Sequence, residues 1–213
     1  MTTDESATTL DGTAFLFPGQ GSQTVGMGRA FYDDWPETRA VFDRLNDALE
    51  IDLPGLCFDG TAEAIQRPSN TQPLLLATGI AVYEGVTAQF DVEPAAVAGH
   101  SLGHFTALAA AGAIEPATTA ALTHRRGECM ERAAAADGPG TMVAVLLADP
   151  DVVAEACAAR EDVGVALYNA PKQTVISGTT DGVAAVRERL EERTTARFRE
   201  LEVGAAFHSP VMA

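Results

Sequence analysis

Residues 95–105 read Ala-Ala-Val-Ala-Gly-His-Ser-Leu-Gly-His-Phe, and this stretch predicts a strand, a sharp turn and a helix. Gly99 and Gly103 flank Ser101 in a Gly-x-Ser-x-Gly pattern. Because glycine lacks Cβ, it allows a crowded turn that presents the serine hydroxyl at the start of the helix. Amides at that helix N-terminus would face an oxyanion formed beside Ser101. The pattern predicts a nucleophile elbow; the alternative is a glycine-flanked turn with a surface serine.

A second segment, Phe15-Leu16-Phe17-Pro18-Gly19-Gln20-Gly21-Ser22-Gln23, runs from an apolar strand into a polar turn. In an open α/β sheet, ligands bind at the carboxyl ends of the strands. We therefore expect the backbone N–H of Gln20 to serve as a second oxyanion donor. The alternative is a plain Pro-Gly turn whose glutamines are solvated.

The third segment carries a histidine, His208, in Ala206-Phe207-His208-Ser209-Pro210. A serine becomes nucleophilic only beside a base. Histidine suits that role because its unperturbed pKa of about 6.5 lets it take and return a proton at neutral pH.

The chain resembles the malonyl-CoA:acyl carrier protein transacylases and the acyltransferase domains of polyketide and fatty acid synthases. The resemblance runs from about residue 13 to the last residue. Six ordered segments carry it: Phe17-Pro18-Gly19-Gln20-Gly21-Ser22-Gln23, Thr71-Gln72-Pro73, Gly99-His100-Ser101-Leu102-Gly103, Arg126-Gly127, Asn169-Ala170-Pro171-Lys172-Gln173 and Phe207-His208-Ser209.

The resemblance implies that Ser101 is the acylated nucleophile and His208 the general base of a ping-pong transfer. The substrate would be malonyl-CoA, a CoA thioester, and the acceptor the phosphopantetheine thiol of an acyl carrier protein. The backbone amides of Gln20 and Leu102 would form the oxyanion hole. No further cofactor is expected.

The resemblance also assigns Arg126 to the free carboxylate of the malonyl group, which a planar guanidinium can bind through two hydrogen bonds. The alternative is that Arg126 is a solvated arginine on a helix. Arg125 is adjacent, so a shift of one residue would turn Arg125 inward instead, but the alignment of the Arg126-Gly127 pair with the family favours Arg126. Phe207 resembles a bulky residue that leaves little room for an α-methyl group, which favours malonyl over methylmalonyl.

Three more residues, His100, Gln72 and Asn169, match family positions that line the site. His104 departs from the family, which usually has a glutamate there, and we expect it to alter the bracing of the elbow. His100 and His104 have the spacing of a helical metal site. However, no glutamate lies between them and His100 precedes the helix, so no metal is expected.

The chain ends at Ala213, five residues after His208. Family members continue with further helix and strand that complete the large sheet. We therefore expect the chain to be truncated at its C-terminus, with the rest of the large subdomain in a further segment or a partner chain.

The predicted fold class is α/β, with an α/β-hydrolase-like parallel sheet in a large subdomain and an inserted ferredoxin-like small subdomain. Residues 1–12 are polar and acidic and predict a disordered extension that is not a signal peptide. Residues 13–137 form the large subdomain, with a strand at 13–17 and helices at 29–50, 73–90 and 116–135. Residues 141–203 follow the ferredoxin-like order β-α-β-β-α-β. Residues 204–213 return to the large subdomain with His208.

The amino-acid composition indicates the kind of cellular environment in which the chain folds. Its 213 residues are 46% hydrophobic, enough for a sizeable core, and no apolar run reaches the length of a membrane span. Its three cysteines are unclustered, which is typical of a reducing cytoplasm. A net charge of −16, with 30 acidic residues and a single lysine, argues against nucleic acid and predicts a surface suited to high salt.

Two other functions remain open from the residues. An α/β-hydrolase esterase or thioesterase shares the elbow, but it needs an acidic triad member on a late strand and has no use for the insertion or Arg126. A non-catalytic, incomplete acyltransferase-like chain would bind a carrier protein or pair with a C-terminal partner.

Overall fold

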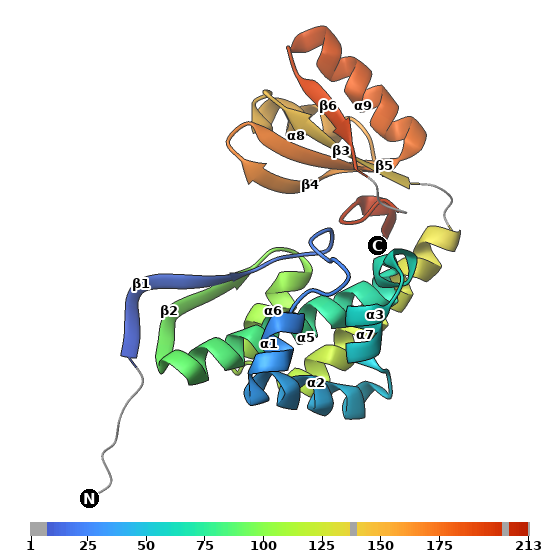
Figure 1. Cartoon of the computed structure of the whole chain (residues 1–213). Coiled ribbons are helices and arrows are strands. Elements are labelled where there is room, and N and C mark those ends of the chain that lie inside the picture. Colours follow the sequence, from blue (N-terminus) through green and yellow to red (C-terminus); the bar gives the residue numbers. More distant parts are fainter. Residues whose placement is uncertain (1–7, 137–139, 202–204, 213) are drawn as a thin grey trace, which may run out of the picture. The chain divides into compact units, whose positions relative to one another are not determined.

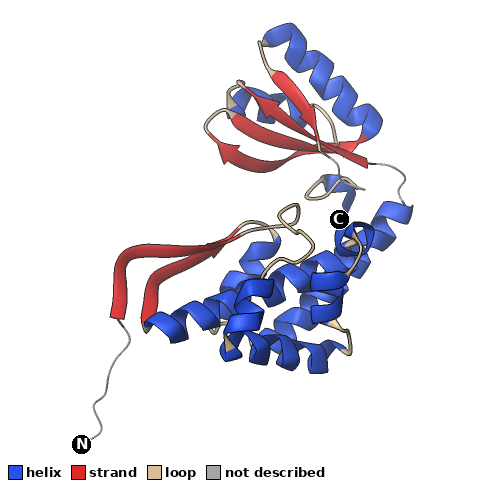
Figure 2. Ribbon diagram, in the orientation of Figure 1, coloured by secondary structure: helices blue, strands red, loops and turns tan. Residues whose placement is uncertain are grey.

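A computed structural model describes residues 8–136, 140–201 and 205–212. The chain divides into unit 1, residues 1–128, and unit 2, residues 129–213. Unit 1 holds helices and a two-stranded sheet, and unit 2 is built on a four-stranded sheet (Figures 1 and 2).

The sheet of unit 1 pairs β1 (Thr8–Phe17) with β2 (Val92–Gly99) in parallel. Phe17 lies opposite Gly99, so both strands end at the same edge. The Gln20 turn and the elbow therefore leave the sheet side by side.

The start of β1 corrects one prediction. The disordered extension expected for residues 1–12 is wrong for residues 8–12, because β1 begins at Thr8 and its first residues pair with Val92, Glu93 and Pro94 of β2. The partner strand satisfies main-chain groups that a free extension would leave to water. Residues 1–7 lie outside the described residues.

Unit 1 contains six helices and the start of a seventh within its described residues. The single helix expected at residues 29–50 is divided, because Trp35 is extended before Pro36, and a residue that precedes proline avoids the helical region. The sequence prediction omitted α3 and α4, which begin after the capping side chains of Asp52 and Thr61. The bounds are α1 (Arg29–Asp34), α2 (Pro36–Leu49), α3 (Leu53–Asp59), α4 (Ala62–Gln66), α5 (Pro68–Phe90), α6 (Leu102–Ala110) and α7 (Pro116–Ala136).

The core of unit 1 packs around α5. Fully buried residues of α2, including Phe42 and Leu45, meet Leu74, Leu76 and Ile80 of α5. Tyr83 of α5 contacts the rings of Phe15 and Phe17 edge to face, which ties β1 to the same helix. This packing fixes the strand from which the Gln20 turn departs.

The elbow between β2 and α6 is a tight backbone crossing. Ser101 has φ 50° and ψ −105°, a conformation that L-residues avoid. A Cβ at Gly99 would collide with the carbonyl of Gly103, and one at Gly103 would collide with the carbonyl of Phe17. Both glycines are therefore required by space, as the sequence pattern predicts.

Unit 2 has the ferredoxin-like order that the sequence predicts. Its elements are β3 (Gly140–Leu146), α8 (Pro150–Ala158), β4 (Val163–Ala170), β5 (Gln173–Thr179), α9 (Thr180–Arg193) and β6 (Arg197–Glu200). The sheet order is β4-β5-β3-β6, and the paired strands are antiparallel. The last strand, expected at 196–203, covers Arg197–Glu200, while residues 202–204 lie outside the described residues.

Different elements pack against the two faces of this sheet. Alternate residues of β3, Val143 and Val145, pack with residues of α8 and α9. The residues that alternate with them, Met142 and Ala144, belong to a second cluster that includes Met130 of α7 and Phe207. The period of two along β3 therefore separates the helices from the segment that carries His208.

An ion pair and a hydroxyl join the connection between α8 and β4 to β5 and α9 at Asp162. Its carboxylate accepts hydrogen bonds from Arg160 Nε (2.8 Å), Arg160 Nη2 (3.0 Å) and Thr179 Oγ1 (2.5 Å). Thr179 in turn accepts from the Gly182 amide and caps α9. The Arg160 guanidinium and the Thr179 hydroxyl hold the pKa of the Asp162 carboxyl well below its usual range.

We expect Asp162→Asn to lower the melting temperature of the chain at pH 7. Because the folded-state pKa is depressed, the stabilisation is present above the unfolded pKa of about 3.9 and is lost as the pH falls through the lower folded value. The difference from wild type, measured by thermal melting from pH 7 to pH 3, should shrink as the pH falls. Asp47→Asn, at an exposed position of α2, is the control. A difference independent of pH would contradict this account.

We expect Gly99→Ala to prevent folding or to lower the melting temperature by more than about 10 °C, because the added Cβ meets the backbone of Gly103. Circular dichroism during heating measures this. Ala96→Val, at an exposed position of the same strand, should change the melting temperature by no more than about 2 °C. A Gly99→Ala variant as stable as wild type would show that the elbow relaxes freely.

Candidate active site

The Gln20 turn lies directly against the elbow. The amide of His100 donates to the carbonyl of Phe17 at 3.0 Å. A Cβ at Gly19 would lie 2.5 Å from the carbonyl oxygen of His100 and 2.9 Å from its Nδ1. The structure thus brings together Gln20, His100, Ser101 and Leu102, as the sequence predicts.

Local hydrogen bonds shape the Gln20 turn. Ser22 Oγ donates to the carbonyl of Gly19 at 2.8 Å, and the amide of Gly21 donates to Gln23 Oε1 at 2.7 Å. The Oε1 atom of Gln20 is buried and makes no hydrogen bond to the described residues. The turn is thus held by its own side chains, with the Gln20 amide at its apex.

Leu102 begins α6, directly after the strained Ser101. Amides in the first turn of a helix have no carbonyl acceptor within that helix. The next two amides are used locally, because Gly103 N donates to the carbonyl of His100 and His104 N to that of Ser101. The buried Leu102 side chain fixes this turn in the core. The geometry suits stabilisation of negative charge beside Ser101. His104 is exposed, and its expected effect on the elbow stays a prediction.

Arg126 of α7 reaches Gln72 of α5. Its Nη1 donates to Gln72 Oε1 at 2.8 Å, and Gln72 is fully buried. The guanidinium also lies over the ring of Phe105, 5.8 Å from its centre, one turn along α6 from Ser101. Burial lowers the pKa of Arg126, but a guanidinium stays charged at neutral pH.

The neighbouring arginine has a different environment. The Arg125 side chain is 65% exposed, and its Nη1 pairs with Glu128 Oε2 at 2.6 Å. Arg126 is therefore the arginine that contacts Gln72, and its guanidinium retains further donors that could hold a carboxylate.

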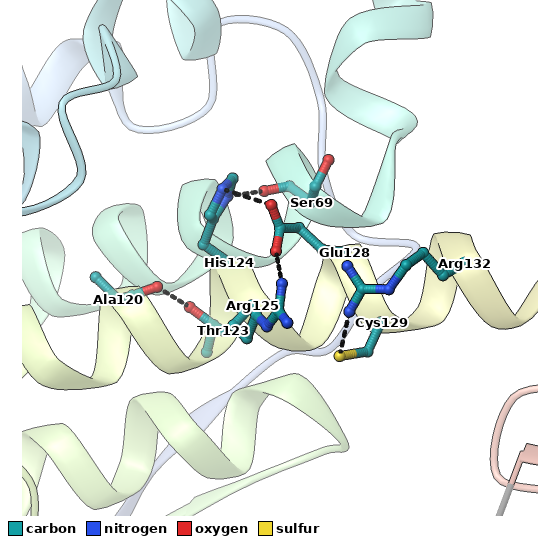
Figure 3. A network of polar contacts seen from close by, with 8 residues as sticks. All are labelled: Ser69, Ala120, Thr123, His124, Arg125, Glu128, Cys129 and Arg132. Carbon is teal, nitrogen blue, oxygen red and sulfur yellow. Dashed lines mark hydrogen bonds and ion pairs between the residues drawn. The ribbon is translucent and has the colours of Figure 1, made fainter.

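A polar network on the same part of α7 was missed by the sequence analysis (Figure 3). His124 Nδ1 lies 2.8 Å from the carbonyl oxygen of Ser69, and its Nε2 lies 3.8 Å from Glu128 Oε1. The signal was Pro73, which cannot donate to the carbonyl four residues earlier in its helix.

Three predicted residues lie in unit 2. His208 is exposed, with φ 57°, between the buried residues Phe207 and Ser209. Ser209 Oγ donates to the carbonyl of Ala206 at 2.6 Å, which closes this turn. Phe207 is 8% exposed and packs in the core cluster with Met130. Its predicted contact with substrate stays a prediction.

Asn169 is exposed and is the last residue but one of β4. Ser101 belongs to unit 1, whereas Asn169 and His208 belong to unit 2. The proposed pairing of Ser101 with His208 therefore stays a prediction, as does the role of Asn169.

Two surveys of the described residues are negative. Within residues 8–136, 140–201 and 205–212, no cluster of three or more His, Cys, Asp or Glu could hold a metal ion. Over the same ranges, none of the helices has the length and apolar character needed to cross a membrane.

Comparison with known proteins gives a consistent result. The chain is 40% identical over 203 residues to the malonyl CoA-acyl carrier protein transacylase of Bacillus subtilis, an alignment that covers 93% of this chain and 63% of that protein. The chain thus spans less than two thirds of that relative's length. The structure of MCAT from Streptococcus pneumoniae superposes with a TM-score of 0.88 at 40% identity, covering 94% of this chain and 66% of that one.

A third match is a chain in the solved structure of a type II PKS acyl-carrier protein in complex with its malonyl-transacylase, with a TM-score of 0.83 at 31% identity. That match covers 91% of this chain and 63% of the other. These structures confirm the predicted fold class, with a parallel sheet and a separate antiparallel one. The model of the acyl transferase domain matches residues 14–213, and the chain therefore belongs to the acyl transferase domain family.

Proposed function

We propose that the chain carries the machinery of a serine acyltransferase, which moves a malonyl group from malonyl-CoA to the phosphopantetheine thiol of an acyl carrier protein. The observation that carries this proposal is that unit 1 holds both a strained Ser101 and a partly buried Arg126, which donates to Gln72. The names of the relatives support the substrate and the acceptor.

In the first half-reaction, Ser101 Oγ attacks the thioester carbonyl while His208 takes the hydroxyl proton. The carbonyl oxygen becomes an oxyanion, for which the amides of Gln20 and Leu102 are the proposed donors. The tetrahedral intermediate collapses, the C–S bond breaks, and the CoA thiolate leaves with the proton from His208. Malonyl remains as an ester on Ser101.

The second half-reaction reverses these roles. His208 accepts a proton from the phosphopantetheine thiol, and the sulfur attacks the ester carbonyl of malonyl-Ser101. The same donors stabilise the second oxyanion. The C–O bond to serine then breaks, and His208 returns the proton to Ser101 Oγ, which regenerates the enzyme.

Arg126 supplies the selectivity for a dicarboxylate. Its guanidinium would bind the free carboxylate of the malonyl group, and a charged hydrogen bond in a partly buried setting is stronger than a neutral one. An acetyl group offers no such partner. Phe207 would favour malonyl over methylmalonyl by limiting space beside the α-carbon.

Arg126 also weighs against the esterase alternative, because a simple ester hydrolase has no carboxylate to bind. The non-catalytic alternative is tested by the acylation experiment below. The expectation of a further C-terminal segment or partner chain stays a prediction.

Two features of the cellular setting belong to the same proposal. Cys57, Cys129 and Cys157 are free thiols, which supports a cytoplasmic location. The net charge of −16 supports an adaptation to concentrated salt, which screens repulsion among acidic side chains.

Brief exposure of the chain to malonyl-CoA in molar KCl should add one malonyl group, detected by intact-mass spectrometry. Ser101→Ala should abolish the adduct because it removes the nucleophile. Arg126→Ala should slow acylation by about 100-fold because the malonyl carboxylate loses its charged partner.

Acetyl-CoA is the control for this experiment, and it should acylate wild type far more slowly than malonyl-CoA. Absence of an adduct from a cooperatively folded wild-type chain would contradict autonomous catalysis and favour the non-catalytic alternative. Equal labelling by the two thioesters would contradict the role of Arg126.

The melting temperature should rise between 0.1 M and 1 M KCl, because the Debye length falls from about 10 Å to about 3 Å over that range. Differential scanning fluorimetry measures this. Sucrose at matched osmolality is the control, since it is excluded from protein surfaces without screening charge. A melting temperature insensitive to KCl would remove the case for adaptation to salt.

A further inference from the structure

A proline within α5 disrupts the hydrogen bonding of that helix at a buried position. Pro73 lies inside α5, and it has no amide hydrogen to donate to the carbonyl of Ser69, four residues earlier. Ser69 is only 7% exposed. The amide that would ordinarily donate to this carbonyl is therefore missing, and a hydrogen bond from outside the helix can take its place.

His124 of α7 provides that partner. Its Nδ1 lies 2.8 Å from the Ser69 oxygen (Figure 3). Because a carbonyl can only accept, Nδ1 must carry the proton in this contact. The other ring nitrogen lies 3.8 Å from Glu128 Oε1, one turn along α7, and Glu128 also pairs with Arg125. The Ser69 carbonyl therefore holds one edge of the ring, and the Glu128 carboxylate lies beside the other edge.

The same two helices meet at two neighbouring points. A Cβ at Gly127 would collide with the carbonyl of Pro68, so the backbones touch there. Arg126, between His124 and Gly127 in the chain, donates to Gln72. The histidine contact therefore lies within one turn of both the backbone contact and the arginine contact, and it bears on the position of the guanidinium.

Hydrogen bonds to α4 hold the first residues of α5 in place. Thr71 is fully buried, and its hydroxyl donates to the carbonyl of Ile65 in α4. Asn70 Nδ2 donates to the carbonyl of Ala64 at 2.9 Å. The contact of His124 thus ties α7 to a segment that α4 already holds in place.

We propose that His124 is a positioning residue for Arg126: its hydrogen bond to the Ser69 carbonyl, to which Pro73 cannot donate, docks α7 where Arg126 meets Gln72. This inference rests on the proposed function, in which Arg126 selects the malonyl carboxylate. It makes the preference for malonyl over acetyl depend on a residue that does not itself contact substrate.

The test measures binding of malonyl-CoA and acetyl-CoA to the full chain carrying Ser101→Ala, by isothermal titration calorimetry. This parent should bind malonyl-CoA more tightly. Adding His124→Leu should lower the ratio of the two affinities by about 10-fold, through weaker binding of malonyl-CoA alone. Adding His124→Asn, whose amide can donate from the position of Nδ1, should restore most of the ratio.

Two further variants separate positioning from general damage. Arg125→Leu, which changes an exposed neighbour on the same turn, should keep the parent's ratio. Pro73→Ala gives the Ser69 carbonyl an amide donor within α5. Combined with His124→Leu, it should support folding while the selectivity stays reduced, because the link between the helices is still missing.

The outcomes are distinguishable. An unchanged ratio in a folded His124→Leu variant, with or without Pro73→Ala, would overturn this inference and leave the proposed function intact. Equal affinities for the two thioesters in the Ser101→Ala parent would overturn the proposed function, and this inference with it.

Discussion

The close backbone approach at the end of β1 and β2 is the constraint on which the candidate site depends. The carbonyls of Phe17 and Gly103 occupy the space that side chains at Gly103 and Gly99 would need. This contact forces Ser101 into its strained conformation and places the Gln20 turn beside it. The candidate nucleophile and both proposed oxyanion donors are thus positioned by one crossing of main chain, held by the packing of β1 and α6 on α5.

The proposed selectivity depends on a second contact, between α7 and the first turns of α5. Gly127 allows the helices to touch, and the buried Gln72 then receives Arg126. A guanidinium in this setting has lost part of its hydration, so it gains more from a carboxylate than an exposed arginine such as Arg125 would. The candidate nucleophile and the candidate selectivity residue are therefore both carried by unit 1, but they are positioned by different backbone contacts.

The sequence pattern predicted well wherever local chemistry decides the structure. The glycines of the elbow and the alternation along β3 follow directly from the sequence, and so does the ferredoxin-like order. The errors arose where pairing or capping decides instead. Residues Thr8–Gly12 form strand because they pair with β2, and the helical stretch at 29–50 is divided before Pro36. Helices α3 and α4 begin at capping side chains and are too short to show a helical period in the sequence.

By itself, the sequence determined the elbow and the order of the elements of unit 2, because glycine sterics and apolar periodicity act over a few residues. The resemblance to the acyltransferase family singled out Arg126, with Arg125 beside it. Only the tertiary structure decided that Arg126 rather than Arg125 meets Gln72, and that His124 bonds to the Ser69 carbonyl. Those contacts join residues about fifty positions apart. They depend on the rotation and depth at which two helices pack, which no local pattern specifies.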